Sequence, residues 1–500
     1  MAKYSGGALI PTLAIDRHDP ASLSMQLATK LREMILSGEL PRGTRLPATR
    51  ILARDHGVSR TTAVTVYEQL ASEGMVTSRV GAGTYVSDEV RPHAFPANAA
   101  DPAPPPPVAN LSREMADQFF PRLEHPRAPR AFVTGMPAFD AFPMALWAQL
   151  SARYWRSPRA EIMSYPDATG LPALRQAICR HLGANRGLLC RPEEVFIFAG
   201  AQDAFFQIAQ ILLEPGDPVW IENPGAIGAR NALLSRGLQL IPVPVDNQGL
   251  DVGAARAAHP APRATFVTPA HQHPLGVPMS RDRRFELLAE AGRVGAWIIE
   301  DDYVGEFHYG RAALPPLKTL DGGGRVIYVG TFSKALFPAI RLGYAVVPGG
   351  LVDLFDRTLT AAARGVSHAI QSTVASFMDE GKFSAHIRRM RALYRDRRDA
   401  LLEEGARHLG GVLDIRATDT GFHTVGLLPP DGLGLRPLER ADCMAAELAQ
   451  AAGVATTPLS RFALAPIAQR GLTLGFSATP PLEIARGVQR LARALRDAPR

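Results

Sequence analysis

Residues 325–344 read RVIYVGTFSKALFPAIRLGY, an apolar run that passes directly into polar and basic residues. The run from Arg325 to Gly330 is short and β-branched, which predicts a buried strand. Lys334 follows just past its end, and Arg341 comes seven residues later. Only five of the 55 basic residues are lysines (Lys3, Lys30, Lys318, Lys334 and Lys382), so a lysine here suggests a task that arginine cannot perform.

A second stretch, RVGAWIIEDDYVGEF (293–307), has the same form. Ala296 to Ile299 is expected to be a buried strand, with Asp301 and Tyr303 following where it ends. Side chains two apart on an extended chain point to the same side. Open α/β sheets bind ligands in the crevice beyond the carboxyl ends of their strands. Asp301 and Tyr303 are therefore expected to face a ligand there.

An aspartate, a tyrosine and a lysine in such places suit pyridoxal phosphate. A lysine amine can form a Schiff base, a carboxylate can keep the pyridine nitrogen protonated, and a phenol can hydrogen-bond the ring hydroxyl. A phosphate group favours a helix N-terminus with cations or hydroxyls nearby. Ser333, Arg341 and the turn Ala199–Gln202, which follows the apolar run Val195–Phe198, meet that need. Taken singly, each charge would be an exposed loop residue, but their joint order favours the cofactor site.

Composition divides the chain into three regions. Residues 13–88 form a compact helical segment that ends in a short β-like stretch. Residues 89–112 are rich in proline and alanine and predict an extended linker. Residues 113–500 alternate apolar runs with helical patterns, which indicates an α/β fold with a mostly parallel sheet and flanking helices.

The first region predicts a helix-turn-helix. Leu23, Leu27, Leu31 and Ile35 form one apolar stripe, a short helix follows at 49–55, and Ser59 is expected to cap a third helix. Residues 75–86, MVTSRVGAGTYV, predict a hairpin or wing. Six arginines against three acids between residues 42 and 79 suit a phosphate-backbone binder. A small helical dimerisation domain is the alternative for such a pattern.

The string PRGTRLPATRILARDHGVSRTTAVTVYEQLASEGMVTSRVGAGTYV (41–86) resembles the winged helix-turn-helix domain of GntR-type bacterial repressors over its whole length. The resemblance implies DNA contact through the arginines of the RLP and SR segments and through the glycine-rich wing. The residues so assigned are Arg45, Arg50, Ser59, Arg60, Thr61, Thr62, Arg79 and Gly81.

From Tyr165 onward the chain resembles a class I aminotransferase of the pyridoxal-phosphate fold-type I group, which also has a smaller α+β subdomain. The strings that carry this resemblance include SYPDATGLPALRQAI, FIFAGAQDAF, TPAHQHPLGVPMS, EDDYVGEF and TFSKALFPAIRLGY. It implies a Schiff base at Lys334, Asp301 on the pyridine nitrogen and Tyr303 on the ring hydroxyl. It further implies that Tyr165 reaches the neighbouring subunit of a homodimer. The remaining implied cofactor contacts are Ser333, Arg341, Gly200, Ala201, Gln202, His271 and Gln272.

Both halves together resemble the MocR/GabR/PdxR type of GntR-family transcriptional regulator. This implies a regulator that binds an operator with two half-sites and senses a small effector, either an amino compound or pyridoxal phosphate itself. An aminotransferase with an accessory DNA-binding domain is the alternative. A regulator whose large domain has lost the cofactor and serves only in dimerisation is the third.

Two positions depart from the aminotransferase pattern. Ala226 stands in ENPGAIGAR where an aromatic residue usually stacks on the ring, and Thr473 stands in GLTLGFSATP where an arginine usually grips the substrate carboxylate. Threonine cannot supply the bidentate fork of a guanidinium. Arg461 is a candidate replacement. The departures argue against efficient transamination of ordinary α-amino acids and leave residual activity open. His423, in the string GFH (421–423), matches a loop near the ligand.

Several classes are disfavoured. The start lacks a signal peptide's apolar segment and no run of about twenty apolar residues occurs, which predicts a cytoplasmic protein with no membrane partner. Three cysteines without CxxC spacing predict neither a disulfide framework nor a metal site. The arginine-rich segment 386–401 is expected to be a helix with a solvated basic face rather than a second DNA-binding surface.

Overall fold

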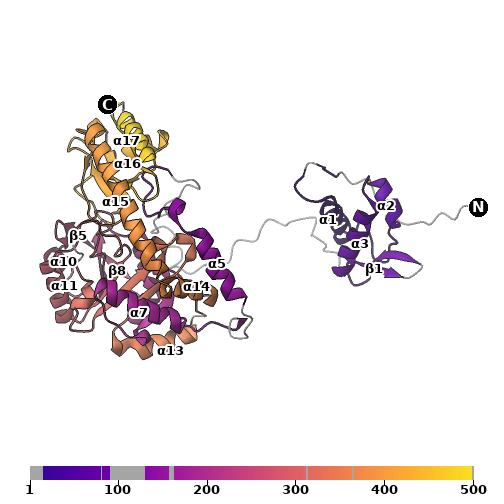
Figure 1. The fold of residues 1–500 in the computed structure, drawn as a ribbon, viewed down its shortest axis with the longest axis horizontal. Helices are drawn as coiled ribbons and strands as arrows, with labels where there is room; N and C mark the ends of the chain where they lie inside the picture. The colour runs from indigo at the N-terminus through magenta and orange to yellow at the C-terminus, as the bar shows by residue number, and fades with distance from the viewer. Residues whose placement is uncertain are drawn as a thin grey trace, which may run out of the picture. The chain divides into compact units, whose positions relative to one another are not determined.

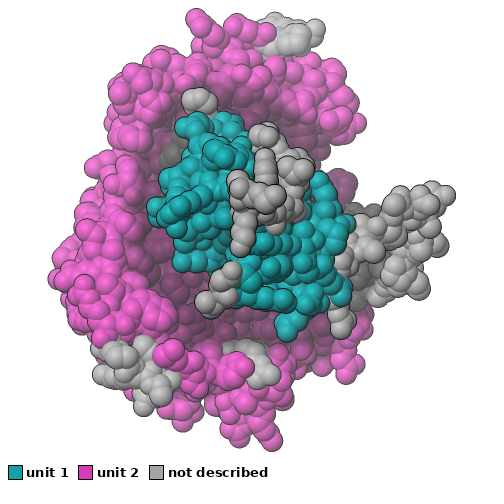
Figure 2. Space-filling view, turned by 90° about the vertical axis from the view of Figure 1, so that its right-hand side faces the viewer, with its two compact units in different colours: residues 1–107 teal, residues 108–500 magenta. Residues whose placement is uncertain are grey.

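The computed structural model describes residues 15–17, 19–79, 82–90, 130–156, 163–310, 314–362 and 365–497. The chain divides into two compact units, residues 1–107 and 108–500, which are drawn as a ribbon in Figure 1 and in separate colours in Figure 2. Most of the predicted linker, from residue 91 to 112, lies outside the described residues, so the boundaries at 13–88, 89–112 and 113–500 stay a prediction.

In its described residues, the first unit contains three helices and a two-stranded wing. Helix α1 (Leu23–Leu36) buries the predicted stripe, with Leu27, Leu31 and Ile35 almost fully enclosed. It packs on α3 (Arg60–Ser72), which also contacts α2 (Thr49–Asp55). The expected cap is confirmed, because Ser59 Oγ accepts a hydrogen bond from the Thr62 amide at 3.0 Å.

The wing follows α3 directly. Strands β1 (Val76–Arg79) and β2 (Gly83–Val86) pair antiparallel, from Val76 opposite Val86 to Arg79 opposite Gly83. The chain before α2 also joins this edge, since Leu46 N donates to Thr84 O at 2.8 Å. The wing and the helix-turn-helix therefore form one hydrogen-bonded unit.

The second unit is built on an eight-stranded sheet. Its strands are ordered β3 (Val195–Phe198), β10 (Gly343–Val346), β9 (Val326–Thr331), β8 (Trp297–Asp302), β7 (Ala264–Val267), β4 (Pro218–Asn223), β5 (Gln239–Asp246) and β6 (Gly249–Leu250). The five strands from β9 to β5 are parallel, and β10 runs antiparallel to both of its neighbours. The predicted mostly parallel α/β sheet is confirmed.

Alternating side chains put apolar residues on both faces of this sheet. Phe196, Phe198, Ile221 and Phe266 belong to a core with α8 (Ala201–Leu212), α9 (Ile227–Leu234) and α13 (Val352–Ala362). On the other side, Trp220, Ile298 and Val326 pack with α10 (Val252–Ala258) and α11 (Arg281–Val294). Val195 and Ile197 pack with α5 (Met144–Trp155), α7 (Pro172–Arg186) and α14 (His368–Asp379). Helices therefore cover both faces (Figure 1).

A smaller α+β subdomain completes the second unit. Its four-stranded antiparallel sheet has the order β11 (Asp414–Ile415), β12 (His423–Leu427), β14 (Gly471–Gly475) and β13 (Thr457–Pro458). The long α15 (Lys382–His408), α16 (Ala441–Ala451) and α17 (Pro481–Arg496) pack together beside it. Within the described ranges, no helix is long and apolar enough to cross a membrane.

The arginine-rich segment lies within α15, and its basic side chains are less solvated than predicted. Arg397 is 2% exposed, pairs with Asp140 at 2.7 Å and donates to Ser477 O. Arg391 donates to Glu306 O at 2.5 Å. These guanidiniums therefore bind the segments that carry Asp140, Ser477 and Glu306 to α15, which connects the main sheet to the smaller subdomain.

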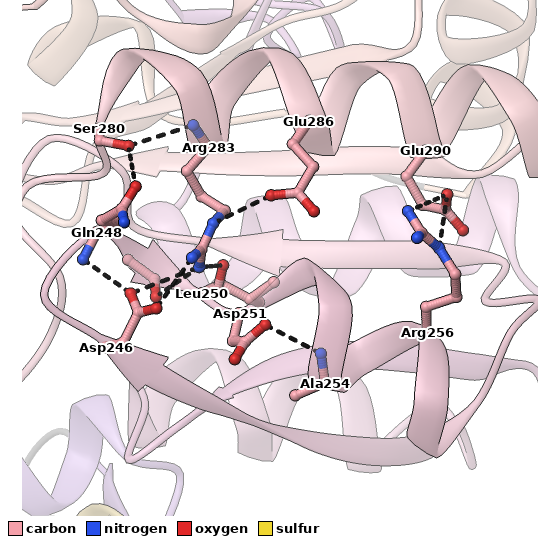
Figure 3. Close-up of polar contacts among 11 residues, drawn as sticks. Asp246, Gln248, Leu250, Asp251, Ala254, Arg256, Ser280, Arg283, Glu286 and Glu290 are labelled. Atoms are coloured by element: carbon pink, nitrogen blue, oxygen red, sulfur yellow. Dashed lines mark hydrogen bonds and ion pairs between the residues drawn. The ribbon is translucent and has the colours of Figure 1, made fainter.

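Charged side chains also fasten α11 to the β5–β6 hairpin (Figure 3). Arg283, whose side chain is 10% exposed, donates to Leu250 O at 2.5 Å and pairs with Asp246 at 2.9 Å and Glu286 at 3.2 Å. Further along α11, Glu290 binds Arg256 at 3.0 Å. Hydrogen bonds from Arg293 and Arg256 lower the pKa of Glu290 to about 2.

Replacing Arg283 by methionine is expected to lower the free energy of unfolding by about 2–4 kcal/mol, because the buried Leu250 carbonyl loses its donor. The midpoint of urea denaturation, followed by far-ultraviolet circular dichroism, measures the change. Arg256→Ala is the matched control, and since its side chain is 49% exposed we expect a loss of about 1 kcal/mol or less. Equal losses in the two variants would contradict this account.

Candidate functional site

Lys334 lies on a single-turn helix at the edge of the main sheet. Strand β9 ends at Thr331, which caps α12 (Phe332–Ala335) by accepting from the Ser333 amide. The half-buried Lys334 Nζ donates to Gly135 O at 2.7 Å. Gly135 has a φ of 73°, which favours glycine, and a Cβ there would stand 2.9 Å from that nitrogen. Burial lowers the pKa of Lys334 to about 8, and the negative charge of Asp301 opposes this shift.

Asp301 is the penultimate residue of β8, which ends at Asp302, three residues beyond the Ile299 predicted from the sequence. Cross-strand pairing with Val329 extends the strand to this point. The side chain is buried, and its Oδ1 has no hydrogen-bond partner among the described residues. Burial and the neighbouring Asp302 raise the pKa of Asp301 well above its ordinary value, while Lys334 lowers it.

Tyr303 and two histidines stand next to these groups. The Tyr303 hydroxyl donates to His271 O at 3.1 Å. The Tyr303 ring lies 5.7 Å from the His273 ring, edge to face. Burial raises the pKa of Tyr303, and the carboxylates of Asp301 and Glu222 add to that shift. The Tyr303 phenol therefore stays protonated near pH 7.

Three imidazoles form one buried cluster in the site. The His423 ring lies 5.0 Å from that of His271 and 5.2 Å from that of His273. Burial lowers the pKa of His423 to about 4 and those of the other two well below their ordinary value. All three are neutral near pH 7. His273 was not among the predicted site residues, although the HQHP spacing places residues 271 and 273 on one side of an extended chain.

Gly200 and Arg341 meet at the start of α8. Gly200 has a φ of 96°, and a Cβ there would lie 3.5 Å from the Arg341 guanidinium. The amides of Ala201 and Gln202 belong to the first turn of a helix, where amides have no intrahelical acceptor. Ser333 precedes Lys334 on α12. These are groups of the kind that bind an anion, namely helix N-terminal amides, a guanidinium and a hydroxyl.

Buried hydrogen bonds hold the residues behind the site. Arg186 donates to Asp302 Oδ2 at 2.6 Å, and the Tyr328 hydroxyl donates to the same oxygen at 2.9 Å. Gln272 donates to Glu222 Oε2 at 3.2 Å and to Pro224 O at 2.9 Å. The Gln272 amide is thus occupied within the protein, which makes it a positioning residue for the turn that carries the histidines.

The two departures from the aminotransferase pattern have clear positions. Ala226 precedes α9 and is half-buried. Thr473 is fully buried in β14 and donates to Thr457 O at 3.3 Å. Arg461 lies in the short turn η8 (Leu459–Phe462), near Arg230, whose pKa burial lowers to about 10 with a further contribution from Arg461.

Tyr165 is 81% exposed, so its predicted contact with a neighbouring subunit stays a prediction. No group of three or more His, Cys, Asp or Glu side chains within the described part of the chain is arranged to hold a metal ion.

The candidate DNA-binding residues lie on the helix-turn-helix and the wing. Arg50, Arg60, Thr61 and Arg79 are exposed. Ser59 and Thr62 are engaged in the cap of α3, where their hydroxyl oxygens lie 2.8 Å apart. The Arg45 guanidinium lies against the wing, where a Cβ at Gly83 would meet its Nε at 3.1 Å. Gly81 lies outside the described residues.

Both units match known families. Residues 23–86 match the family described as "Bacterial regulatory proteins, gntR family". Residues 136–491, which contain the site around Lys334, match "Aminotransferase class I and II".

Related proteins share this arrangement over nearly their full length. The probable rhizopine catabolism regulatory protein MocR of Rhizobium meliloti is 39% identical over 96% of this chain and 95% of its own. The transcriptional regulator TauR of Rhodobacter capsulatus is 33% identical over 95% and 97%. The pyridoxine biosynthesis regulator PdxR of Corynebacterium glutamicum is 30% identical over 83% and 85%.

Solved structures resemble the second unit. LysN, an α-aminoadipate aminotransferase of Thermus thermophilus complexed with N-(5'-phosphopyridoxyl)-L-leucine, is 28% identical with a TM-score of 0.65, over 77% of this chain and 94% of its own. The kynurenine aminotransferase of Pyrococcus horikoshii is 25% identical with a TM-score of 0.67, over 78% and 95%. The chain therefore belongs to the MocR type of GntR-family transcriptional regulators, in which a DNA-binding gntR domain is joined to an aminotransferase-like domain.

Proposed function

We propose that this regulator binds pyridoxal phosphate through Lys334 and that an amine effector at the same site changes its binding to DNA. The observation that carries the proposal is the half-buried Lys334 amine, with a pKa lowered to about 8, next to the buried Asp301 carboxyl. A lysine in a structural ion pair would instead keep its ordinary charge.

The residues present fit this cofactor. Asp301 Oδ1 is a buried acceptor without a partner among the described residues, as a protonated ring nitrogen requires. The cradle formed by Gly200, Arg341 and the first turn of α8 suits a phosphate dianion. Tyr303 and the His273 ring, whose buried Nδ1 also has no partner in the described chain, suit the polar edge of the ring.

The chemistry assigned to each residue follows from its environment. Bound pyridoxal phosphate supplies an electron-withdrawing ring and an aldehyde that combines with amines. The Lys334 amine is deprotonated for a substantial fraction of the time near pH 8 and acts as the nucleophile. Asp301 would bind the ring nitrogen of the cofactor through Oδ1 and keep that nitrogen protonated. Tyr303 would hydrogen-bond the ring hydroxyl, while its own proton stays on the phenol oxygen.

The expected effector is an amine that lacks an α-carboxylate. Thr473 places a short neutral side chain where aminotransferases carry the arginine that grips this group. The neighbouring cluster of His271, His273 and His423 is neutral near pH 7, so it adds hydrogen-bonding capacity without positive charge. Poor carboxylate binding also disfavours turnover of ordinary amino acids and favours a sensor over an enzyme.

DNA recognition is assigned to the first unit. We expect the exposed N-terminal residues of α3, Arg60 and Thr61, to read base edges, and the exposed Arg50 and Arg79 to hold phosphates. A homodimer would present two such units to two half-sites. An effector can change DNA affinity only if it binds the two arrangements of these units with different free energies.

The rate at which Lys334 combines with pyridoxal phosphate is expected to rise about tenfold per pH unit below pH 8 and to level off above it. The sign follows from the lowered pKa, because the reactive neutral amine becomes the main form above about pH 8 instead of above 10.5. Stopped-flow absorbance of the cofactor-free full-length protein measures the rate.

Lys334→Arg is the control, because it keeps a cation and removes the primary amine. We expect no covalent adduct after borohydride reduction and peptide mass spectrometry. A rate that keeps rising to about pH 10, or an adduct in this variant, would contradict the assignment to Lys334.

Arg60→Ala is expected to weaken binding to the operator by about tenfold or more, since it removes a side chain at the start of the recognition helix. Fluorescence anisotropy with DNA from upstream of the protein's own gene, at several salt concentrations, measures the affinity. Arg388→Ala removes one exposed arginine from the second unit and should leave affinity unchanged. Equal effects, or binding without sequence preference, would sink this assignment.

Thr473→Arg is expected to strengthen the response to α-amino acids by about tenfold or more relative to amines without a carboxylate. Titration of the cofactor's visible absorbance with paired ligands, such as an amino acid and its decarboxylated amine, measures both affinities. Wild-type protein should prefer the amine. A wild-type preference for the amino acid that disappears in Arg461→Ala would show instead that Arg461 grips the carboxylate.

A further inference from the structure

Two of the three cysteines lie in contact. Cys179 is on α7, and Cys190 is in the loop between α7 and the turn η2 (Pro192–Glu194). Their sulfur atoms are 3.4 Å apart, and both side chains are half-buried rather than enclosed. The third cysteine, Cys443 on α16, has the Ser460 hydroxyl 3.3 Å from its sulfur instead. Cys443 therefore serves as an internal control for the reactivity of the pair.

The loop that carries Cys190 can bring the sulfurs together. A disulfide has a sulfur–sulfur distance of about 2.05 Å, so the atoms must approach by roughly 1.4 Å. Gly187, which has a φ of 65°, caps the end of α7, and Leu189 in the loop that follows is 86% exposed. Leu188 of this loop is buried in the core, so the short approach falls to the more exposed end of the loop, Leu189 and Cys190, while Cys179 stays on its helix.

The two thiols differ in reactivity. The Cys190 thiol donates a hydrogen bond to Cys179 Sγ, which lowers the pKa of Cys179, and Arg175, one turn earlier on α7, lowers it further. Burial and the carboxylates of Glu193 and Glu194 oppose this. The same hydrogen bond, with burial, raises the pKa of Cys190. Cys179 is therefore the thiolate that attacks first.

We propose that Cys179 and Cys190 form a reversible disulfide with a small-molecule disulfide of the glutathione class as oxidant. The Cys179 thiolate attacks one sulfur of the oxidant, forming a mixed disulfide and releasing one thiolate. Cys190 then loses its proton and attacks Cys179 Sγ, which closes the protein disulfide and releases the second thiol. The two protein sulfurs give up two electrons, and the oxidant becomes two thiols. This site is independent of the proposed effector chemistry.

The two cysteines lie on segments that lead to the site around Lys334. Helix α7 ends with Arg186, which holds Asp302 next to Asp301. On the other side, Cys190 leads through η2 into β3 and on to the Gly200 turn. The bond would thus connect two segments that each end at a different part of the site.

The test treats the reduced full-length protein with oxidised glutathione, then alkylates it and maps the cysteines by peptide mass spectrometry. We expect Cys179 and Cys190 to lose alkylation together and to appear as one cross-linked species, while Cys443 stays alkylated. Dithiothreitol should restore both. Cys443→Ser is the matched control and should leave the reaction unchanged.

Single variants separate the two steps. Cys190→Ser should accumulate a glutathione adduct on Cys179, while Cys179→Ser should react at least about tenfold more slowly at Cys190. Circular dichroism verifies that each variant is folded. Persistent alkylation of both cysteines in the wild type, a stable glutathione adduct there, or cross-links through Cys443 would overturn the proposal.

Discussion

The electrostatic interaction between Asp301 and Lys334 is the one on which the chemistry of the site in the second unit depends. Both groups lie at the edge of the main sheet, where burial disfavours either charge. Each partly stabilises the charged form of the other, which leaves an amine with a pKa of about 8 and a carboxyl with a raised pKa. The exclusion of water from these two side chains therefore shifts their pKa values at least as much as their charges do.

The other buried carboxyl groups near Asp301 need hydrogen-bond donors or a countercharge. Glu222 and Glu300 are buried close to Asp301, and burial raises the pKa of each to about 7. Neutral donors satisfy Glu222, through the Thr268 hydroxyl at 2.6 Å, and backbone amides satisfy Glu300. Asp302 alone receives a full countercharge, from Arg186. Removing either partner would leave an uncompensated buried charge, which is far more costly than losing an exposed pair.

The sequence predicted the fold class well, because strand-length apolar runs and strand-end polar residues are local signals that periodicity exposes. It also placed Lys334, Asp301 and Tyr303 on segments that the fold brings together. It missed Gly135 and His273, since the first lies 199 residues from Lys334 along the chain and the second stands in a turn whose direction depends on Gln272. The buried role of Arg397 was equally hidden, because a distant Asp140 supplies its partner.

The departures at Ala226 and Thr473 lie in the two parts of the second unit, the first beside the main sheet and the second in the smaller subdomain. Ala226 directly precedes α9. The smaller subdomain binds the segment just before it, where Gly225 N donates to Phe462 O at 3.0 Å and Asn223 Oδ1 accepts from Leu464 N at 2.8 Å. Thr473 belongs to the sheet of that subdomain. An enzyme gains rate by gripping its substrate across such a contact in the transition state. A sensor needs only a difference in binding free energy between two arrangements, so a threonine in place of the carboxylate-binding arginine is compatible with regulation.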